Sequence, residues 1–465
     1  MKIHFSGIGG TAMIGGAYLA KQKGYEIRGS DNPLYPPTSI LVKKLSVPIY
    51  ECYKSSNLDW GPDIVVIGNA LSRGNEEVET VLDKRMTYTS LPEWLRYNIL
   101  QKRKSIVVSG THGKTTTTSL IAWILKVANM KPGYLIGGYP IDFEFPAELG
   151  EENSYFVIEG DEYDTAFFDK RAKFLHYLPQ VVVITSLEYD HSDIYNNIHE
   201  IEKAFQLLLR TVPSKGLVCL CGDNNAQILK EYCFSQSITY GFSDECLWKT
   251  KVEFSADNKQ MEQHIYYKDK YLGKVTTSLF GNHNALNILC GVAVTHSLGI
   301  PFSVIRDGIS SFRGVRRRQE IFFMAQGKTF IDDFAHHPTA IKETLLSFKM
   351  KYPDKRIIAV FEPRSNTTVT NIFQNEITDA LSLANEVWIT PIYREEKIPE
   401  EKRLNKIEIV EILNKRGIKA NNAKTYDEIF QYLCNNLEGE VIVILMSNGA
   451  CGHLRENIQN YYSKK

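Results

Sequence analysis

Short apolar runs alternate along the whole chain with longer stretches in which apolar positions recur with a helical period. In the first segment, a glycine loop and the small-residue stretch Thr11–Lys23 follow the first apolar run, and Gly24 is a common type of helix stop. This order of strand, helix and strand favours a parallel sheet, and it continues to about Arg103. The strands expected here are Lys2–Ser6, Tyr25–Arg28 and Asp63–Ile67.

The same alternation starts again after Arg103. It predicts a helix over Lys114–Ala128 and two closing helices, Asn284–Leu298 and Pro301–Phe312. Between them, the polar stretch Tyr232–Thr277 alternates only weakly, and we interpret it as an antiparallel excursion within this segment. The strands expected in the second segment are Ser105–Ser109, Tyr155–Ile158 and Gln180–Thr185.

A third segment begins near Gly314, where a glycine and three arginines follow two helices. Its expected strands, with helices between them, are Lys328–Asp332, Arg356–Phe361, Glu386–Ile389 and Glu440–Met446. The pattern therefore predicts an α/β protein with three domains, over residues 1–103, 104–313 and 314–465. A length of 465 residues agrees with three domains, since a domain usually has roughly 100–200 residues.

Charge and composition exclude several classes of protein. The 54 basic and 54 acidic residues cancel, so we expect no nucleic-acid and no membrane partner. No apolar run approaches the roughly 18 residues of a membrane span, and the first residues lack the apolar stretch of a signal peptide. The eight cysteines form no CxxC pair, which indicates reduced thiols and a cytoplasmic location. The oligomeric state stays open.

The first glycine loop, Gly7–Ala12, lies between a predicted strand and a predicted helix, where a phosphate can approach backbone N–H groups. Asp31 follows the second strand, where acids that bind a ribose are often found. Alone, these features would indicate an NAD site, although Ala12 breaks the full G-x-G-x-x-G pattern. The loop could also simply pack the helix on the strand, and it does not tell which nucleotide binds.

The second glycine loop, Gly110–Thr118, also follows a strand and opens a helix. Its backbone amides can hold a triphosphate, Lys114 can neutralise the transferred phosphate, and Thr115 can place its hydroxyl on magnesium. Only two residues separate Gly110 from Gly113, where an ordinary P-loop has four. An accidental Gly-Lys-Thr turn is a poor explanation in this strand–loop–helix context.

This compressed loop, GTHGKTTTT, resembles that of the Mur ligases and of the related folylpolyglutamate synthetases. Further matches to the Mur ligase family occur in the same order, and the resemblance covers essentially the whole chain. They are the acidic motif Glu159–Asp164, the pair Asp190-His191, the adenine-binding motif Gly281–Asn287 and the third-domain signature Asp332–Pro338. The resemblance implies a Rossmann-like UDP-binding domain, a central P-loop ATPase-like domain and a C-terminal Rossmann-like ligase domain.

The reaction that the resemblance implies is ATP-dependent formation of an amide bond on UDP-N-acetylmuramate, through an acyl phosphate. Two kinds of family member act on this substrate, one adding L-alanine in peptidoglycan biosynthesis and one adding L-Ala-γ-D-Glu-meso-diaminopimelate in murein recycling. The segments Glu362–Thr367, Gly160–Arg171 and Met446–Gly449 resemble the second kind, although Gly160 stands where alanine is typical. Gln206 occupies the place of a carbamylated lysine, so we expect no carbamate. The L-alanine ligase remains the alternative.

The resemblance also implies the site residues. Those expected to be catalytic are Lys114, Glu159, His191 and His337. Those expected to bind ATP are Gly110, Thr111, His112, Gly113, Lys114, Thr115, Thr116, His283, Asn287, Arg318 and Asp332. Magnesium, with manganese as an alternative, is expected on Thr115, Glu159 and His191. UDP-muramate is expected on Gly9, Thr11, Asp31 and Asn69, and the peptide on Arg364, Ser365 and Asn366.

Several of these residues have ordinary structural explanations. Without the resemblance, His191 would be interpreted as a structural histidine, and His283 and Asn287 as part of a helix cap and polar face. His336 is the structural alternative to His337. Two other classes of function fit part of the pattern. An NAD-dependent oxidoreductase would explain the first loop and not the second, and a non-catalytic nucleotide sensor would not need Lys114, Glu159 and His191 together.

Overall fold

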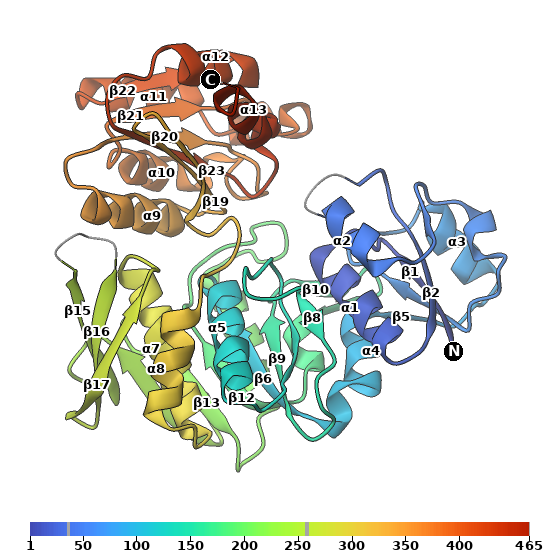
Figure 1. Ribbon diagram of the computed structural model, residues 1–465. Coiled ribbons are helices and arrows are strands. Elements are labelled where there is room, and N and C mark those ends of the chain that lie inside the picture. The colour runs from blue at the N-terminus through green and yellow to red at the C-terminus, as the bar shows by residue number, and fades with distance from the viewer. Residues whose placement is uncertain (35–37, 256–259, 465) are drawn as a thin grey trace.

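The computed structural model describes residues 1–34, 38–255 and 260–464 (Figure 1). The chain folds into three α/β domains, and each domain is built on its own mainly parallel sheet. In Figure 1 the N-terminal part, in blue, and the C-terminal part, in orange and red, lie against different sides of the green and yellow central part. The predicted α/β class with three domains is confirmed, while the boundaries at 103/104 and 313/314 stay predictions.

The first sheet has five parallel strands in the order β3-β2-β1-β4-β5, the doubly wound arrangement of a nucleotide-binding fold. Its strand order reverses between β1 and β4, so the loops after these strands open a crevice. The strands are β1 (Lys2–Ser6), β2 (Glu26–Ser30), β3 (Ile49–Tyr50), β4 (Ile64–Ile67) and β5 (Tyr88–Ser90). The helices are α1 (Thr11–Gln22), α2 (Thr38–Leu45), α3 (Glu76–Asp83) and α4 (Leu91–Asn98).

The central sheet has ten strands in the order β17-β16-β15-β14-β13-β12-β6-β9-β7-β8. Its strands are β6 (Lys104–Ser109), β7 (Gly133–Leu135), β8 (Ala147–Glu148), β9 (Tyr155–Gly160), β12 (Pro179–Ile184), β13 (Leu217–Cys221), β14 (Gln236–Gly241), β15 (Trp248–Phe254), β16 (Met261–Tyr267) and β17 (Lys270–Thr277). A small hairpin, β10 (Asp164–Ala166) and β11 (Asp169–Ala172), follows β9. The helices are α5 (Lys114–Val127), α6 (Ile198–Leu209), α7 (Asn282–Ser297) and α8 (Phe302–Ser311).

The antiparallel excursion expected over Tyr232–Thr277 is partly wrong. β14 pairs in parallel with β13, and β15 pairs in parallel with β14, so the parallel sheet continues into this stretch. Within this stretch, only β15, β16 and β17 pair antiparallel, at one end of the sheet (Figure 1). Residues 256–259 of the expected excursion lie outside the described residues. The polar alternation of β15–β17 fits strands that have one exposed face.

The third sheet has the order β18-β19-β23-β20-β21-β22, parallel except for the β18–β19 hairpin. Its strands are β18 (Glu320–Ala325), β19 (Lys328–Asp333), β20 (Arg356–Phe361), β21 (Glu386–Ile389), β22 (Lys419–Asn422) and β23 (Val441–Met446). The helices α9 (Pro338–Lys351), α10 (Gln374–Leu381) and α11 (Lys406–Lys415) pack on one face, and α12 (Tyr426–Asn435) and α13 (Leu454–Tyr462) on the other. Every residue of β23 is buried between these layers.

The first two domains share one continuous hydrophobic cluster, which includes Ile14 of α1 and Leu135 of β7. Gly15 allows the close approach of α1, because a Cβ there would collide with Leu135 Cδ1. The third domain has hydrophobic clusters of its own, one on each face of its sheet. The first and central domains are therefore joined more firmly than the third domain is joined to either.

The predicted helices and strands are confirmed, with ends that shift by at most two residues. All eight cysteines are free thiols. Among the described residues, no helix has the length and apolar character needed to cross a membrane.

Candidate active site

The loop between β6 and α5 is held in a shape that only glycine permits at two positions. Gly110 and Gly113 have φ angles of 125° and 80°, and a Cβ at Gly110 would collide with Thr185 Oγ1. The N–H of Thr111 donates to the Ser186 carbonyl at 3.1 Å, which fixes the loop against the end of β12. The loop therefore presents the free N–H groups at the start of α5 to the space above the sheet.

Lys114, the first residue of α5, is folded over this loop. Its Nζ donates to the Gly110 carbonyl at 2.6 Å and to both carboxylate oxygens of Glu162, at 2.9 and 3.1 Å. Burial by itself lowers the pKa of Lys114, but the charges of Glu162, Asp161 and Glu159 outweigh it and raise the pKa. The lysine is therefore a largely buried cation that is paired with Glu162.

Glu159 lies at the end of β9, with its two oxygens held separately. Oε1 accepts from the Thr115 hydroxyl at 3.0 Å, and Oε2 accepts from the Gly137 N–H at 2.9 Å. Burial raises the pKa of Glu159, and the positive charge of Lys114 partly opposes this. A hydroxyl beside a buried carboxylate is a suitable donor pair for a hard cation such as magnesium.

A second group of possible ligands lies beside the first. Asp161, Glu162 and His191 offer ligand atoms that lie within 4.8 Å of one another, and His191 Nε2 is 2.9 Å from Glu162 Oε1. Burial lowers the pKa of His191, but Glu162 and Asp190 outweigh it, so the pKa is raised. Thr115 and Glu159, which are expected to share a metal ion, are thus in contact. His191 is grouped with two acids, Asp161 and Glu162, that the sequence did not indicate as site residues. The acidic run after β9 is the signal that could have found them.

His283 and Asn287 lie one turn apart at the start of α7. Asn287 Oδ1 accepts from the Thr117 hydroxyl at 3.1 Å, and a Cβ at Gly113 would collide with the same oxygen. Asn287 therefore also supports the glycine loop. His283 Nδ1 lies 3.6 Å from Glu343 of α9, so this part of the site reaches the third domain.

The two adjacent acids of the third domain face in different directions. Asp332 Oδ2 accepts from Arg455 at 2.9 Å and lies 3.4 Å from Arg317, so it belongs to an ion-pair cluster. Asp333, one residue further on, lines the cavity described below and accepts from the Gln319 N–H at 2.7 Å. Successive side chains of a strand point to opposite faces, which explains the difference. Arg318 lines the same cavity, with its guanidinium 4.6 Å above the Phe334 ring.

His337 is the N-cap of α9, where its Nδ1 accepts from the Thr339 N–H at 3.4 Å. Its Nε2 lies 3.2 Å from the Tyr189 carbonyl of the central domain, and its ring is 4.7 Å from that of His112. Burial and the neighbouring His112 lower the pKa of His337 to about 4. His336, which sequence reasoning assigned a structural role, is the neighbour that lines the cavity.

In the first domain, Asp31 holds the glycine loop, since its Oδ2 accepts from the Gly9 N–H at 2.6 Å. A side chain at Gly9 would collide with Leu34. Thr11 and Asn69 line the cavity, and Asn69 Nδ2 reaches the Asp164 carbonyl of the central domain at 3.4 Å.

The segment after β20 brings the expected peptide contacts to the opposite wall. Arg364, Ser365 and Asn366 all line the cavity. The Arg364 guanidinium lies 3.8 Å above the Tyr393 ring, and Nη1 is 3.6 Å from the fully buried Glu362. Thr367, which was not predicted, donates its hydroxyl to Asp190 of the central domain at 2.9 Å.

One cavity of about 1220 Å³ connects these groups, and all three domains line it. The sequence-predicted residues on its wall are Thr11, Asn69, Thr111, His112, Gly113, Lys114, Thr115, Thr116, Glu159, His191, His283, Asn287, Arg318, Arg364, Ser365 and Asn366. Five predicted residues do not line the cavity but make the hydrogen bonds described above: Gly9, Asp31, Gly110, Asp332 and His337. A glycine loop at the start of a helix can hold a triphosphate, and the hydroxyl and carboxylates beside it can hold magnesium.

Three family models match successive parts of the chain. They are described as the Mur ligase family catalytic domain, at residues 2–103, the Mur ligase middle domain, at 108–295, and the Mur ligase glutamate ligase domain, at 317–449. The chain belongs to the Mur ligase family, a family of ATP-dependent ligases that form carbon–nitrogen bonds.

Individual relatives show which kinds of Mur ligase the chain is similar to. The UDP-N-acetylmuramate–L-alanyl-γ-D-glutamyl-meso-2,6-diaminoheptandioate ligase of Escherichia coli is 38% identical, over 100% of this chain and 99% of its own. A solved murein peptide ligase from Psychrobacter arcticus is 32% identical, covers 100% of this chain and 99% of its own, and superposes with a TM-score of 0.75. The UDP-N-acetylmuramate–L-alanine ligase of Carboxydothermus hydrogenoformans is 33% identical over 97% of this chain and 94% of its own.

Proposed function

We propose that this protein is an ATP-dependent ligase that joins UDP-N-acetylmuramate to the tripeptide L-Ala-γ-D-Glu-meso-diaminopimelate, in murein recycling. The observation that carries the proposal is the single cavity to which a phosphate-binding type of loop, two acidic groups and an arginine-bearing wall all contribute. Full-length similarity to tripeptide-adding ligases supports this choice of substrates. The NAD-dependent oxidoreductase alternative has no support from these similarities.

In this proposal, ATP lies along the Gly110–Thr116 loop, and Lys114 turns from Glu162 to the phosphates. The lactyl carboxylate of UDP-N-acetylmuramate is phosphorylated, and the peptide amine then displaces phosphate from the acyl phosphate. Magnesium, when bound, offsets the repulsion between the anionic groups that meet here. Thr115 and Glu159 are proposed to hold one ion, and His191 with its neighbouring acids a second.

The remaining residues are proposed to position the substrates. His283, Asn287 and Arg318 would contact ATP, and the first-domain residues Thr11 and Asn69 would contact UDP-muramate from the opposite side. Arg364 would bind a carboxylate of the peptide, since its guanidinium is fixed between Tyr393 and Glu362. Gly9, Asp31, Asp332 and His337 would act through the backbone and side chains that they hold. A cytoplasmic location is part of the same proposal.

The test is phosphate release from ATP with magnesium and UDP-N-acetylmuramate, comparing L-alanine with the tripeptide as the second substrate. We expect release with the tripeptide, and we expect Lys114→Ala to lower kcat by about 10²–10³-fold because a charge at the transferred phosphate is lost. Release with L-alanine alone would identify the alternative, an alanine-adding ligase, which the 33% identity to such an enzyme keeps open. Release with neither amine would contradict both.

A further inference from the structure

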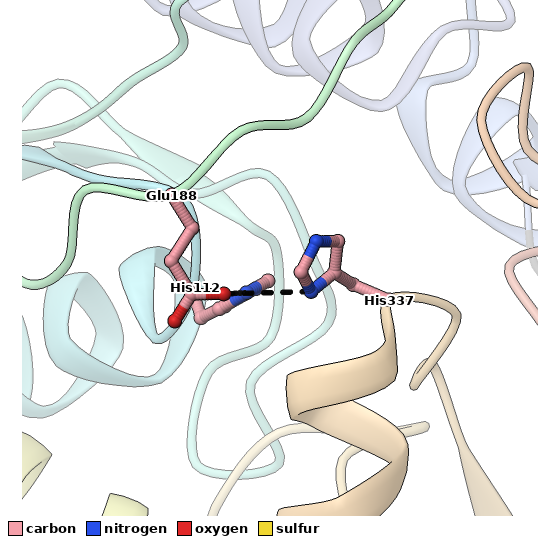
Figure 2. Close-up of side chains that lie close together, drawn as sticks. All are labelled: His112, Glu188 and His337. Carbon is pink, nitrogen blue, oxygen red and sulfur yellow. Dashed lines mark hydrogen bonds and ion pairs between the residues drawn. The ribbon is translucent and has the colours of Figure 1, made fainter. Parts of the chain in front are cut away.

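Two histidines and a glutamate meet where the third domain touches the central one. Figure 2 shows His112 of the glycine loop, Glu188 of the segment after β12 and His337 at the start of α9, with their side chains pointing toward one another. Their ligand atoms lie within 4.8 Å of one another. These three residues, called here the junction cluster, are separate from the Asp161, Glu162 and His191 group.

We propose that the junction cluster is a binding site for a divalent transition-metal ion of the zinc type. Zinc is commonly bound by three protein ligands in such a combination of imidazoles and one carboxylate, with a fourth position left for water. Magnesium, in contrast, prefers a shell of oxygen ligands, which this cluster does not offer.

Two of the three distances between ligand atoms agree with tetrahedral zinc, and the third lies within 4.8 Å. With metal–ligand bonds of about 2.0–2.2 Å, neighbouring ligand atoms of a tetrahedral site lie about 3.3–3.5 Å apart. In the structure, Glu188 Oε2 lies 3.3 Å from His112 Nε2 and 3.6 Å from His337 Nδ1. An ion could therefore enter with only small movements of the side chains.

The surroundings of His337 fix the tautomer that a metal ligand needs. Its Nε2 lies 3.2 Å from the Tyr189 carbonyl, which can only accept a hydrogen bond, so Nε2 carries the proton. The lone pair of Nδ1 then accepts only the long 3.4 Å hydrogen bond from the Thr339 N–H, which a metal ion would replace. A backbone carbonyl on the far nitrogen is the usual second partner of a metal-binding histidine.

Glu188 is also held in place, since its Oε2 accepts from the Thr339 hydroxyl at 2.6 Å. The side chains of His112 and Glu188 are 24% and 28% exposed and line the large cavity, whereas His337 is almost fully buried. A metal ion can thus enter from the cavity, and the fourth position faces water. Because His112 and Glu188 belong to the central domain and His337 to the third, the ion would tie the two domains together.

The test is titration of the purified, metal-stripped full-length protein with Co²⁺ and Zn²⁺, in excess magnesium to fill oxygen-rich sites. We expect one equivalent of Co²⁺ to give the visible absorption of a tetrahedral site. Zn²⁺ should displace it and raise the melting temperature.

Variants locate the site. His337→Asn keeps an N-cap for α9 but removes the imidazole, and we expect it and His112→Gln to weaken zinc binding by more than about 10-fold. Thr339→Val, which removes only the hydroxyl on Glu188, should weaken it by about 10–100-fold. His191→Asn, in the other group, should bind zinc as the parent does.

Three outcomes would overturn the proposal. Unchanged binding in His337→Asn would show that the imidazole is not a ligand. Loss of zinc binding in His191→Asn would place the ion in the Asp161, Glu162 and His191 group instead. No binding by the parent protein would leave the junction cluster as a purely hydrogen-bonded contact. Because His337→Asn keeps the cap, its melting temperature without metal shows whether the variant is folded.

Discussion

At the scale of single residues, buried polar side chains are satisfied by particular partners, and Glu77 is a clear case. The fully buried carboxylate accepts from the hydroxyls of Ser6 and Ser30, both at 2.6 Å, and from Asn57 Nδ2 at 2.7 Å. Burial raises the pKa of Glu77, but hydrogen bonds from His4, Ser30 and Ser6 outweigh it, and the pKa is lowered. The ionised form is therefore the one that stabilises the first domain.

We expect Glu77→Gln to lower the free energy of unfolding by about 1–3 kcal/mol at neutral pH, because the amide cannot accept all of these hydrogen bonds. The folded-state pKa lies below the unfolded one, so the contribution of Glu77 is complete above the unfolded pKa and is lost as pH falls through the folded pKa. Urea unfolding of both proteins from about pH 7 to about pH 3 measures this. A gap between them that does not narrow in acid would contradict it.

Arg364 is expected to select the peptide. Arg364→Ala should raise KM for the tripeptide by about 30-fold, equivalent to about 2 kcal/mol, because the substrate carboxylate loses its charged partner. KM for ATP should change little. Initial rates with each substrate varied separately test this, with Arg364→Lys as the matched control that keeps charge but loses the fork geometry and the stacking on Tyr393. An equal rise in both KM values would assign Arg364 a general structural role.

The residues of a contiguous motif were easier to predict than those that tertiary structure selects. The Gly110–Thr116 loop could be predicted because its glycines, lysine and threonine are consecutive. The different roles of Asp332 and Asp333 could not be predicted, because Asp332 is bonded to Arg455 in α13, over a hundred residues away, and Asp333 to the Gln319 N–H. The same holds for Thr367 and its contact with Asp190.

At the scale of elements, α1 shows how a helix with little amphipathic character is used. Small residues make both of its sides suitable for close packing, with Gly15 against Leu135 of β7 and Gly16 against Leu91 of α4. The sequence predicted this helix from its small residues and the stop at Gly24. It did not predict the packing on β7. Very short strands such as β3, with two residues, hold too few positions for a pattern to be detected.

We expect Gly15→Val to destabilise the protein by about 1–3 kcal/mol, since a branched side chain would push α1 away from Leu135. Gly15→Ala is the graded control. Its methyl group would collide only with the flexible end of Leu135 and would make an ordinary contact with Ala147 Cβ. Alanine also favours the helix by about 1 kcal/mol over glycine, so the net effect should be small. Thermal unfolding distinguishes the two, and equal losses would mean that the contact with Leu135 does not limit stability.

At the scale of the whole molecule, the first and central domains form one unit and the third domain forms another. The first and central domains share a hydrophobic cluster, whereas polar contacts such as those of Thr367 with Asp190 and Thr339 with Glu188 join the third domain to the central one. Polar contacts between domains can exchange with water at modest cost. The third domain is therefore the part expected to open and close around the cavity.

Small-angle scattering tests this motion. We expect the radius of gyration to fall when a non-hydrolysable ATP analogue, magnesium and UDP-N-acetylmuramate are added together, because the ligands fill the cavity between the two units. Thr367→Val should enlarge the ligand-free protein and leave the liganded form unchanged, since it removes one contact across the junction. An identical radius of gyration with and without ligands would contradict the expected closure.

The pairing of Lys114 with Glu162 has a consequence for how tightly nucleotide is held. Under the proposed function, the phosphates of the nucleotide must replace the Glu162 carboxylate as the ionic partner of Lys114. Nucleotide entry is then an anion exchange at one ammonium group, and its affinity reflects the difference between two partners rather than the full strength of either. In such an exchange, Glu162 neutralises the lysine whenever the phosphates are not bound to it. The same carboxylate competes with the product nucleotide for the lysine, which favours product release.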